Sequence, residues 1–96
     1  MPTANETVTI RLPRALLQFW SGPATVSVTG TTLSEALEQV DERAPGLAGR
    51  VLDDQGRIRQ HVAIFVNGAM LETREAANVP LRPGDVVRVV PSVSGG

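Results

Sequence analysis

The chain contains no cysteine and no lysine, and each absence excludes a kind of chemistry. Without cysteine there can be no disulfide, no thiolate metal site and no cysteine nucleophile. Without lysine, no side chain offers an amine that could be acylated. The single histidine, His61, cannot form a metal site without several carboxylates beside it, and the adjacent Asp53 and Asp54 precede Gln55-Gly56 as in a turn. We therefore expect no metal centre.

An excess of one charge is also lacking, because ten acidic residues stand against nine basic ones and the formal net charge is −1. Binding to nucleic acid or to an anionic membrane would call for a basic excess. No apolar run approaches the roughly 20 residues that span a bilayer, and the first residues lack the features of a signal peptide. We expect a cytoplasmic protein that binds neither nucleic acid nor membrane.

The length of 96 residues suits one small domain, and alternation of polar and apolar residues predicts its strands. Residues 7–12 and 25–29 alternate without a break, and a loop that holds Trp20 joins them. Trp20 is expected to cover one end of the core. A continuous apolar run over residues 62–66 predicts a central strand, and Asn67-Gly68 is a tight-turn signal before a short return strand. The last strand is predicted over residues 86–90, after a turn at residues 81–85.

One helix is predicted between the second and third strands. Thr32 and Glu35 have the spacing of a capping box, in which each side chain accepts a hydrogen bond from a backbone N–H of the helix start. Leu33, Ala36, Leu37 and Val40 then mark one apolar face, and Pro45-Gly46 ends the helix after about 12 residues. Residues 47–61 give no clear signal. The order β-β-α-β-β-β predicts an α+β β-grasp fold, a mixed sheet with one helix across one face.

The sequence ends in Val93-Ser94-Gly95-Gly96, directly after the last strand and Pro91. Two residues without side chains can enter a narrow channel of another protein, where the terminal carboxylate could react. A frayed end would carry the same residues. The two glycines alone do not distinguish these alternatives.

Taken together, these elements resemble the ubiquitin-like sulfur carriers of the ThiS/MoaD type. The resemblance rests on the element order, on Phe65-Val66-Asn67-Gly68, and on Pro83-Gly84-Asp85-Val86-Val87 leading to the segment 91–96. It spans nearly the whole chain and is closest to the longer carriers, including those that serve cysteine biosynthesis. It implies a single domain over residues 1–96 with a flexible tail over residues 91–96.

The resemblance also implies a chemistry for Gly96. A partner of the ubiquitin-activating type adenylates its carboxylate with ATP, a sulfur donor displaces AMP, and the resulting thiocarboxylate delivers sulfur to an acceptor enzyme. Gly95, Ser94 and Val93 would form the tail that enters the partner's channel. No nucleophile–base pair or carboxylate pair is apparent in the sequence. The chain is therefore expected to be a carrier and not an enzyme, with no catalytic residue and no stably bound cofactor.

Strand alternation predicts which residues face a partner. Val87, Val89 and Ile64 should face the helix, which leaves Val86, Arg88, Val90 and Phe65 on the open face of the sheet near the tail. An apolar patch of Phe65 and Val90 on a polar face is typical of a partner surface. The alternative is that residues 47–61 or a homodimer cover Phe65, and Arg88 could simply be solvated.

Other functions are compatible with the same residues. A ubiquitin-like modifier would form isopeptide bonds through Gly96, and a β-grasp binding module would have an inert tail. The acceptor of the sulfur could belong to molybdopterin, thiamin, cysteine or secondary-metabolite synthesis. The absence of lysine would protect an activated carboxylate, but a GC-rich genome also favours arginine codons and is the explanation we prefer.

Overall fold

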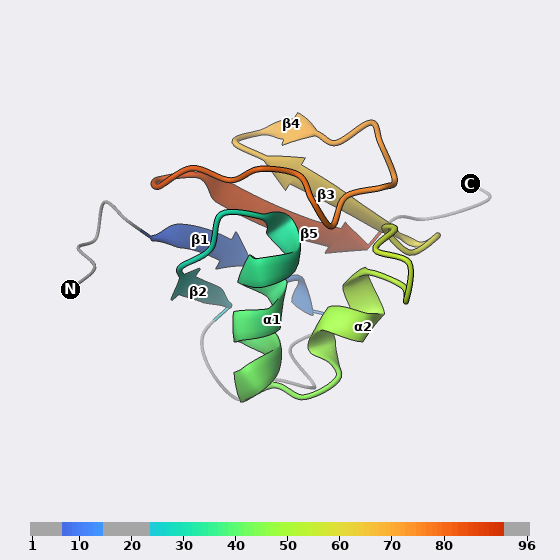
Figure 1. The fold of residues 1–96 in the computed structure, drawn as a ribbon, viewed down its shortest axis with the longest axis horizontal. Helices are drawn as coiled ribbons and strands as arrows, with labels where there is room; N and C mark the ends of the chain where they lie inside the picture. The colour runs from blue at the N-terminus through green and yellow to red at the C-terminus, as the bar shows by residue number, and fades with distance from the viewer. Residues whose placement is uncertain (1–6, 15–23, 92–96) are drawn as a thin grey trace.

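The structure, a computed structural model, describes residues 7–14 and 24–91. Val93 to Gly96 and Trp20, singled out above, lie outside these residues. Five strands and two helices follow one another along the described chain (Figure 1). Their bounds are β1 Val8–Arg11, β2 Thr25–Val28, α1 Leu33–Arg43, α2 Leu47–Val51, β3 Val62–Val66, β4 Ala69–Met70 and β5 Val86–Pro91.

The strands form one mixed sheet in the order β2-β1-β5-β3-β4. The first and last strands, β1 and β5, lie side by side and run parallel, whereas the other pairs are antiparallel. Both helices lie against the same face of the sheet (Figure 1). The predicted mixed sheet with a helix across one face is confirmed, and β5 has a strand on each side. No helix of the described segments has the length and apolar character needed to cross a membrane.

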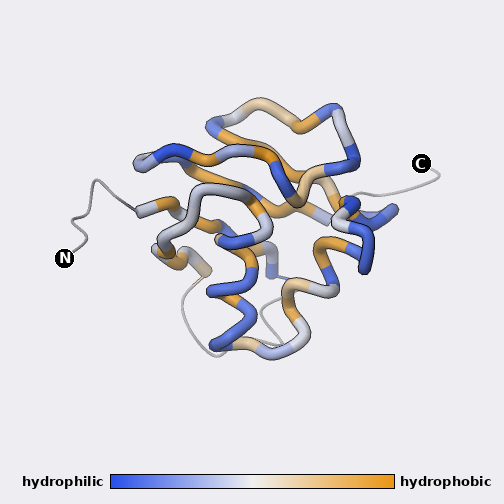
Figure 2. Tube along the Cα trace, in the orientation of Figure 1, coloured by the Kyte–Doolittle hydropathy of each residue, from blue (hydrophilic) through white to orange (hydrophobic). Residues whose placement is uncertain are grey.

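Alternation along the strands decides which face is buried. Ile10, Ile64 and Val87 have no exposed surface, and Val89 is 2% exposed, so these side chains point toward the helices. Each fully buried residue of this size contributes about 1.5–3 kcal/mol relative to an exposed one. Figure 2 shows orange apolar residues along the strands and alternating orange and blue residues along α1. Because the side-chain period of a strand is two, burial of this set forces the intervening residues onto the other face.

Helix α1 begins as the sequence predicts, except for one hydrogen bond. The Thr32 side chain accepts a bond from the Glu35 N–H at 3.2 Å. The Glu35 carboxylate accepts mainly from the N–H of Thr31 at 2.7 Å and from its hydroxyl, and more weakly from the backbone N–H of Thr32. Thr31 is therefore the main donor in the reciprocal half of the predicted capping box. Thr32 also forms an isolated bridge with Pro80, which ties the helix start to the loop before β5.

A second helix corrects the prediction of a single one. Helix α2 lies beside α1, and its Leu47 and Val51 are fully buried (Figure 1). The Asp41 carboxylate accepts bonds from the N–H groups of Gly46 at 3.0 Å and Ala48 at 3.1 Å, and so satisfies donors at the helix start. Five residues are too few for a stable isolated helix. Packing against α1 therefore stabilises a turn that the local sequence does not signal.

Candidate functional site

The open face of the sheet carries the four residues predicted to meet a partner. Arg88 is exposed, whereas Phe65, Val86 and Val90 are half-buried. Arg88 is directly opposite Phe65 in the pairing of β3 with β5, and Val90 is opposite Ala63. The structure thus places Phe65, Val86, Arg88 and Val90 on one face, as the sequence predicted.

Two residues that the sequence analysis did not select complete a row across the sheet. Arg11 is the neighbour of Arg88 on β1, and Met70 is the neighbour of Phe65 on β4. The row therefore runs Arg11, Arg88, Phe65, Met70, and we call it the sheet row. Met70 is 55% exposed. Alternation along β1 already points Arg11 outward, but its position beside Arg88 depends on which strands become neighbours.

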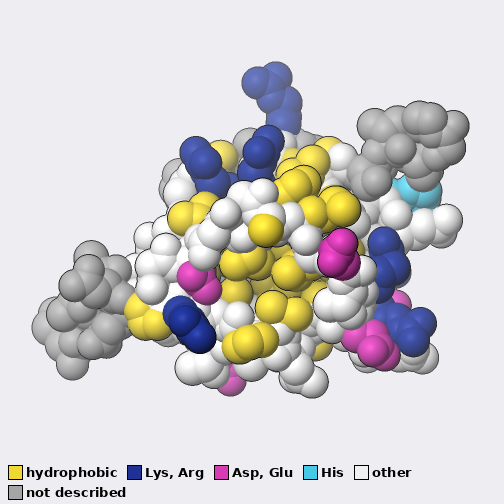
Figure 3. Space-filling model, turned by 90° about the horizontal axis from the view of Figure 1, so that it is seen from above, with side chains coloured by type: hydrophobic (Ala, Val, Ile, Leu, Met, Phe, Trp, Pro, Cys, Tyr) yellow, Lys and Arg dark blue, Asp and Glu magenta, His cyan; other side chains and the backbone are white. Residues whose placement is uncertain are grey.

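The charge of the sheet row is not balanced by acids. Arg11 and Arg88 are both exposed, and the one ion pair within residues 7–14 and 24–91 joins Arg57 to Glu75. In Figure 3, dark-blue basic side chains project from the upper side of the molecule with no acidic side chain among them. A basic and apolar surface of this kind suits a partner surface that is acidic and apolar.

The segment that was suggested to cover Phe65 lies elsewhere. Residues 47–58 place Leu47, Val51 and Ile58 in the buried core that the helices share. These residues close the helix side of the sheet, so the covering of Phe65 by residues 47–61 is wrong. Covering by a second copy of the chain stays a prediction.

A hollow borders the end of β5 on the β1 side. Its volume is about 510 Å³, and its lining includes Arg11, Pro13, Arg88, Val90 and Pro91. Pro91 belongs to β5, where it is opposite Val62, so the strand is one residue longer than predicted and Pro91 is not part of a tail. Proline is tolerated there because β1 ends its pairing at Arg88 and needs no N–H from residue 91. The predicted Val93, Ser94, Gly95 and Gly96 follow this hollow in sequence and lie outside the described residues.

The start of β5 is held by a pair of polar side chains. Asn67, in the turn after β3, has a φ of 52°, a left-handed conformation that asparagine tolerates. Its side chain donates to the Asp85 carboxylate and accepts from the N–H of Val86, both at 2.9 Å. Asp85 also accepts from the Arg82 N–H at 2.8 Å, as predicted for a bond within its own turn. The bonds from Arg82 and Asn67 lower the pKa of Asp85, because they stabilise the ionised form.

The described residues offer no assembled catalytic or metal site. They contain no group of three or more metal-ligating side chains and no buried polar or charged side chain. Asp53, considered above as a metal ligand, accepts from the N–H groups of Gln55 at 2.9 Å and Arg57 at 3.0 Å. This is the predicted turn. What the arrangement offers is an exposed basic and apolar surface that leads to the end of β5.

The fold and this surface define a ubiquitin-like β-grasp protein. The chain belongs to the ThiS family, whose model matches residues 18–96. The sulfur carrier protein CysO of Mycobacterium tuberculosis is 28% identical over 91 residues, which covers 93% of this chain and 98% of the relative. Its crystal structure has a TM-score of 0.79 at 26% identity and covers 90% of this chain and 99% of that one.

Two further proteins extend the comparison. Small archaeal modifier protein 3 of Haloferax volcanii is 34% identical over 65 residues, which covers 68% of this chain and 70% of the relative. The complex of BexX with CysO from Amycolatopsis orientalis has a TM-score of 0.80 at 24% identity, covers 93% of this chain and 99% of that one, and bears on the fold alone. These relatives are thus named as a sulfur carrier and a small modifier protein.

Proposed function

We propose that the chain is a sulfur carrier whose Gly96 carboxylate is adenylated and then converted to a thiocarboxylate. The observation that carries this proposal is membership of the ThiS family over residues 18–96, a match that runs through the two final glycines. The likeness to CysO over 93% of the chain supports it. The chain supplies the carrier body and the reactive carboxylate, and partner enzymes supply the catalysis.

The chemistry proceeds by two displacements, the first at the α-phosphorus of ATP and the second at the Gly96 carbonyl carbon. A carboxylate oxygen attacks the α-phosphate of ATP, which releases pyrophosphate and forms an acyl-adenylate. Sulfide then attacks the carbonyl carbon and the C–O bond to AMP breaks, which leaves the thiocarboxylate. A persulfide donor would require a thiol to cleave the intermediate acyl disulfide. The carboxylate is a poor acyl donor until the mixed anhydride supplies a good leaving group.

Three partners follow from these steps. They are an adenylating enzyme of the ubiquitin-activating type, a sulfur donor, and an enzyme that accepts the sulfur. We place the reaction in the cytoplasm because the activating partner consumes ATP. The sheet row, which lies on β1, β5, β3 and β4, is the surface we assign to partner docking, with Val86 and Val90 beside it. That CysO of Amycolatopsis orientalis forms a complex with BexX is consistent with docking of this fold on a partner protein.

Intact-mass measurement tests the proposal. The chain is incubated with an adenylating enzyme of the ThiS class, ATP and sodium sulfide, and the expected product is heavier by about 16 mass units, since sulfur replaces oxygen. Deletion of Gly95 and Gly96 should abolish the product. Gly49→Ala is the matched control, because Gly49 has an ordinary φ and open space where a Cβ would stand. An unchanged mass with a demonstrably active enzyme would refute the sulfur-carrier proposal.

The likeness to a small archaeal modifier favours one alternative, conjugation through Gly96 to amines of other proteins. The same incubation distinguishes it, with a lysine-containing protein extract added. Covalent adducts that survive reduction and denaturation indicate a modifier, whereas a free thiocarboxylate without adducts indicates a carrier. If deletion of Gly95 and Gly96 changes neither the thiocarboxylate yield nor the covalent adducts, the chain is a binding module with an inert tail.

A further inference from the structure

A second hollow, lined by arginines, lies on the other side of the end of β5. Its volume is about 530 Å³, and its lining includes four arginines, His61 and one acid, namely Arg50, Arg57, Arg59, Arg74, His61 and Asp53. We call it the arginine hollow. Four of the nine basic residues of the chain thus line one hollow, although the chain as a whole has a net charge of −1. Concentration of one charge in a neutral protein creates a local field that can steer a charged partner.

Neutral acceptors hold two of these arginines in position. Arg74 donates to the backbone carbonyl of Ile58 at 2.9 Å and also to that of Arg59. Arg59 donates from its Nε to the carbonyl of Gly49, the middle residue of α2. A carbonyl oxygen orients a guanidinium without cancelling its charge, and each group keeps further N–H donors for a ligand. The hollow is therefore preorganised and remains basic.

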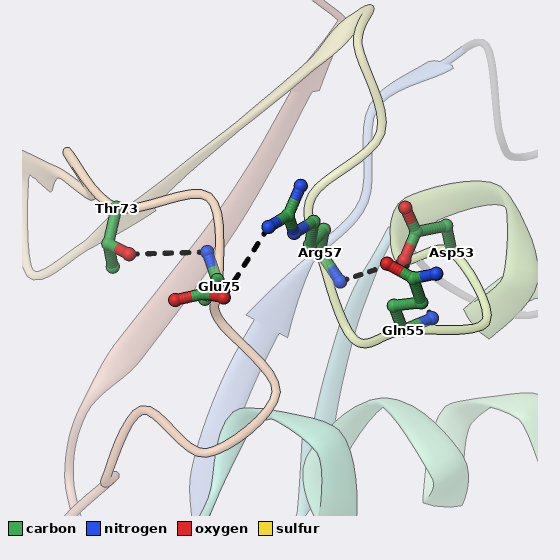
Figure 4. A network of polar contacts seen from close by, with 5 residues as sticks. All are labelled: Asp53, Gln55, Arg57, Thr73 and Glu75. Atoms are coloured by element: carbon green, nitrogen blue, oxygen red, sulfur yellow. Dashed lines mark hydrogen bonds and ion pairs between the residues drawn. The ribbon is translucent and has the colours of Figure 1, made fainter.

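The acids near the hollow are engaged in local structure. Asp53 accepts from two N–H groups of its own turn, and the bonds from Arg57 and Gln55 lower its pKa. Glu75 pairs with Arg57 at 3.6 Å between exposed side chains, a contact of small energy. Figure 4 shows Glu75 and Thr73 on one side of Arg57 and the Asp53 turn on the other. Among the described residues neither Arg59 nor Arg74 forms an ion pair, although the nearby Asp53 carboxylate attracts Arg59.

The position of the hollow links it to the end of the sheet. His61 and Val62 belong to its lining, and Val62 is directly opposite Pro91. The hollow that Arg11 and Arg88 line also includes Pro91. A partner that reaches the end of β5 therefore meets arginine-lined surface on both sides.

We propose that the arginine hollow binds an acidic segment of a partner protein. Guanidiniums also bind phosphate, but no backbone donors converge here to enclose one, because the N–H groups of Asp53, Ile58, Arg59 and Val62 already donate to carbonyl oxygens within the chain. Nucleic acid would call for a basic excess over the whole chain, whereas the formal net charge is −1, and no Phe, Tyr or Trp stands among the described residues that line the hollow. Exposed guanidiniums over a wide hollow match carboxylates carried on an extended chain.

Peptide binding tests this inference without ATP, sulfide or an activating enzyme. A fluorescein-labelled peptide of glutamates is titrated with the chain at low salt, with the equivalent glutamine peptide as the charge control. Backbone amide shifts are expected to cluster at residues 49–62 and 74. The double variant Arg57→Gln, Arg59→Gln should weaken binding about fivefold, since exposed pairs are worth up to about 1 kcal/mol each.

The matched control is the double variant Arg43→Gln, Arg82→Gln, which removes the same charge from exposed arginines that line neither hollow. It should change the affinity less than twofold. Equal losses in both variants, shifts confined to the sheet row, or equally tight binding of inorganic phosphate or an oligonucleotide to the hollow would each overturn the inference. If a variant fails to fold, the backbone amide shifts of the unmodified chain still show whether the peptide binds at residues 49–62 and 74.

The same titration with a chain that lacks Gly95 and Gly96 separates this inference from the proposed function. Binding should be unchanged, because the arginines to which the inference assigns binding lie between Arg50 and Arg74. The inference therefore stands or fails independently of whether Gly96 becomes a thiocarboxylate.

Discussion

Arg11 and Arg88 are adjacent on parallel strands and both are exposed, although like charges in neighbouring strand positions are destabilising. Nothing in the packing of the body requires this juxtaposition, because neither side chain contributes to the core. A surface that is costly in the free protein is explained if a partner supplies the opposing charge. We therefore expect each of the two arginines to lower the stability of the free chain and to strengthen its binding to a partner.

Arg88→Glu tests this at the level of one residue. The new carboxylate would face Arg11, so we expect the melting temperature to rise by about 3 °C, which corresponds to about 0.5 kcal/mol. The kcat/KM of the adenylating partner for the chain should fall about tenfold, since a repulsive charge enters the docking surface. Thermal denaturation and steady-state kinetics measure the two effects. Arg82→Glu is the control, and a loss of stability in Arg88→Glu without a kinetic change would contradict the assignment.

Among the elements, the turn over residues 53–56 is packed closely against the loop that follows β4. Gly56 has a φ of 78°, and its carbonyl accepts from the N–H groups of Ala76 and Ala77. A Cβ on Gly56 would stand 2.7 Å from the Cβ of Ala77. Gly68 also has a positive φ, of 87°, but nothing lies within 4 Å of its would-be Cβ. Both glycines have a positive φ, but only Gly56 lacks room for a Cβ.

Alanine at each glycine separates these contributions. Gly68→Ala should lower the free energy of unfolding by about 1 kcal/mol, the cost of a left-handed residue with a side chain. Gly56→Ala should cost a further 1–3 kcal/mol or so, because the loop at Ala77 must move. Urea denaturation measures both. Equal costs would show that the loop gives way without strain.

The contact between the turn after β3 and the start of β5 depends on an ionised Asp85. Since the folded chain lowers the pKa of Asp85, the unfolded chain binds the proton more readily. The stabilisation is therefore complete above the ordinary pKa of 3.8 and is lost as the pH falls through the lower value of the folded state. Asp53 and Glu35 also have lowered pKa values, so acid should loosen the turn and the α1 cap as well.

Asp85→Asn should destabilise the chain by about 1 kcal/mol at neutral pH, because the charged acceptor is lost. The difference from the unmodified chain should shrink as the pH falls below 3.8, where Asp85 becomes protonated in both the unfolded and, at lower pH, the folded state. Denaturation curves between pH 7 and pH 2 or so measure this convergence. Asp54→Asn, in an exposed turn, serves as the control. A difference that stays constant with pH would mean that the charge of Asp85 contributes nothing.

At the scale of the whole molecule, the body and the final residues are expected to be separable. Every buried apolar residue of the described chain lies between Val8 and Val89. A chain shortened to end at Pro91 should therefore keep its melting temperature within about 2 °C, since stability follows buried surface. The same shortened chain should yield no thiocarboxylate. Thermal denaturation and intact mass test the pair, and a large loss of stability would show that the final residues belong to the folded body.

Much of the fold follows from local sequence patterns. The helix that these patterns do not predict depends on tertiary contacts. Alternation predicts the strand faces because successive side chains of a strand point to opposite sides. Helix α2 is not predictable in this way, because five residues that include Gly49 have little helix propensity. It forms where Leu47 and Val51 enter the shared core and Asp41 bonds to its first turn.

The sequence by itself determined the kinds of elements, the outward direction of Phe65, Val86, Arg88 and Val90, and the resemblance that points to Gly96. Side-chain direction follows from local backbone geometry, so it can be predicted from the order of residues along a strand. Only the tertiary structure decided that Arg11 lies beside Arg88 and that arginines from residues 50–74 line one hollow. Those adjacencies depend on β1 closing against β5 and on loops folding over the core, contacts between residues far apart in the chain.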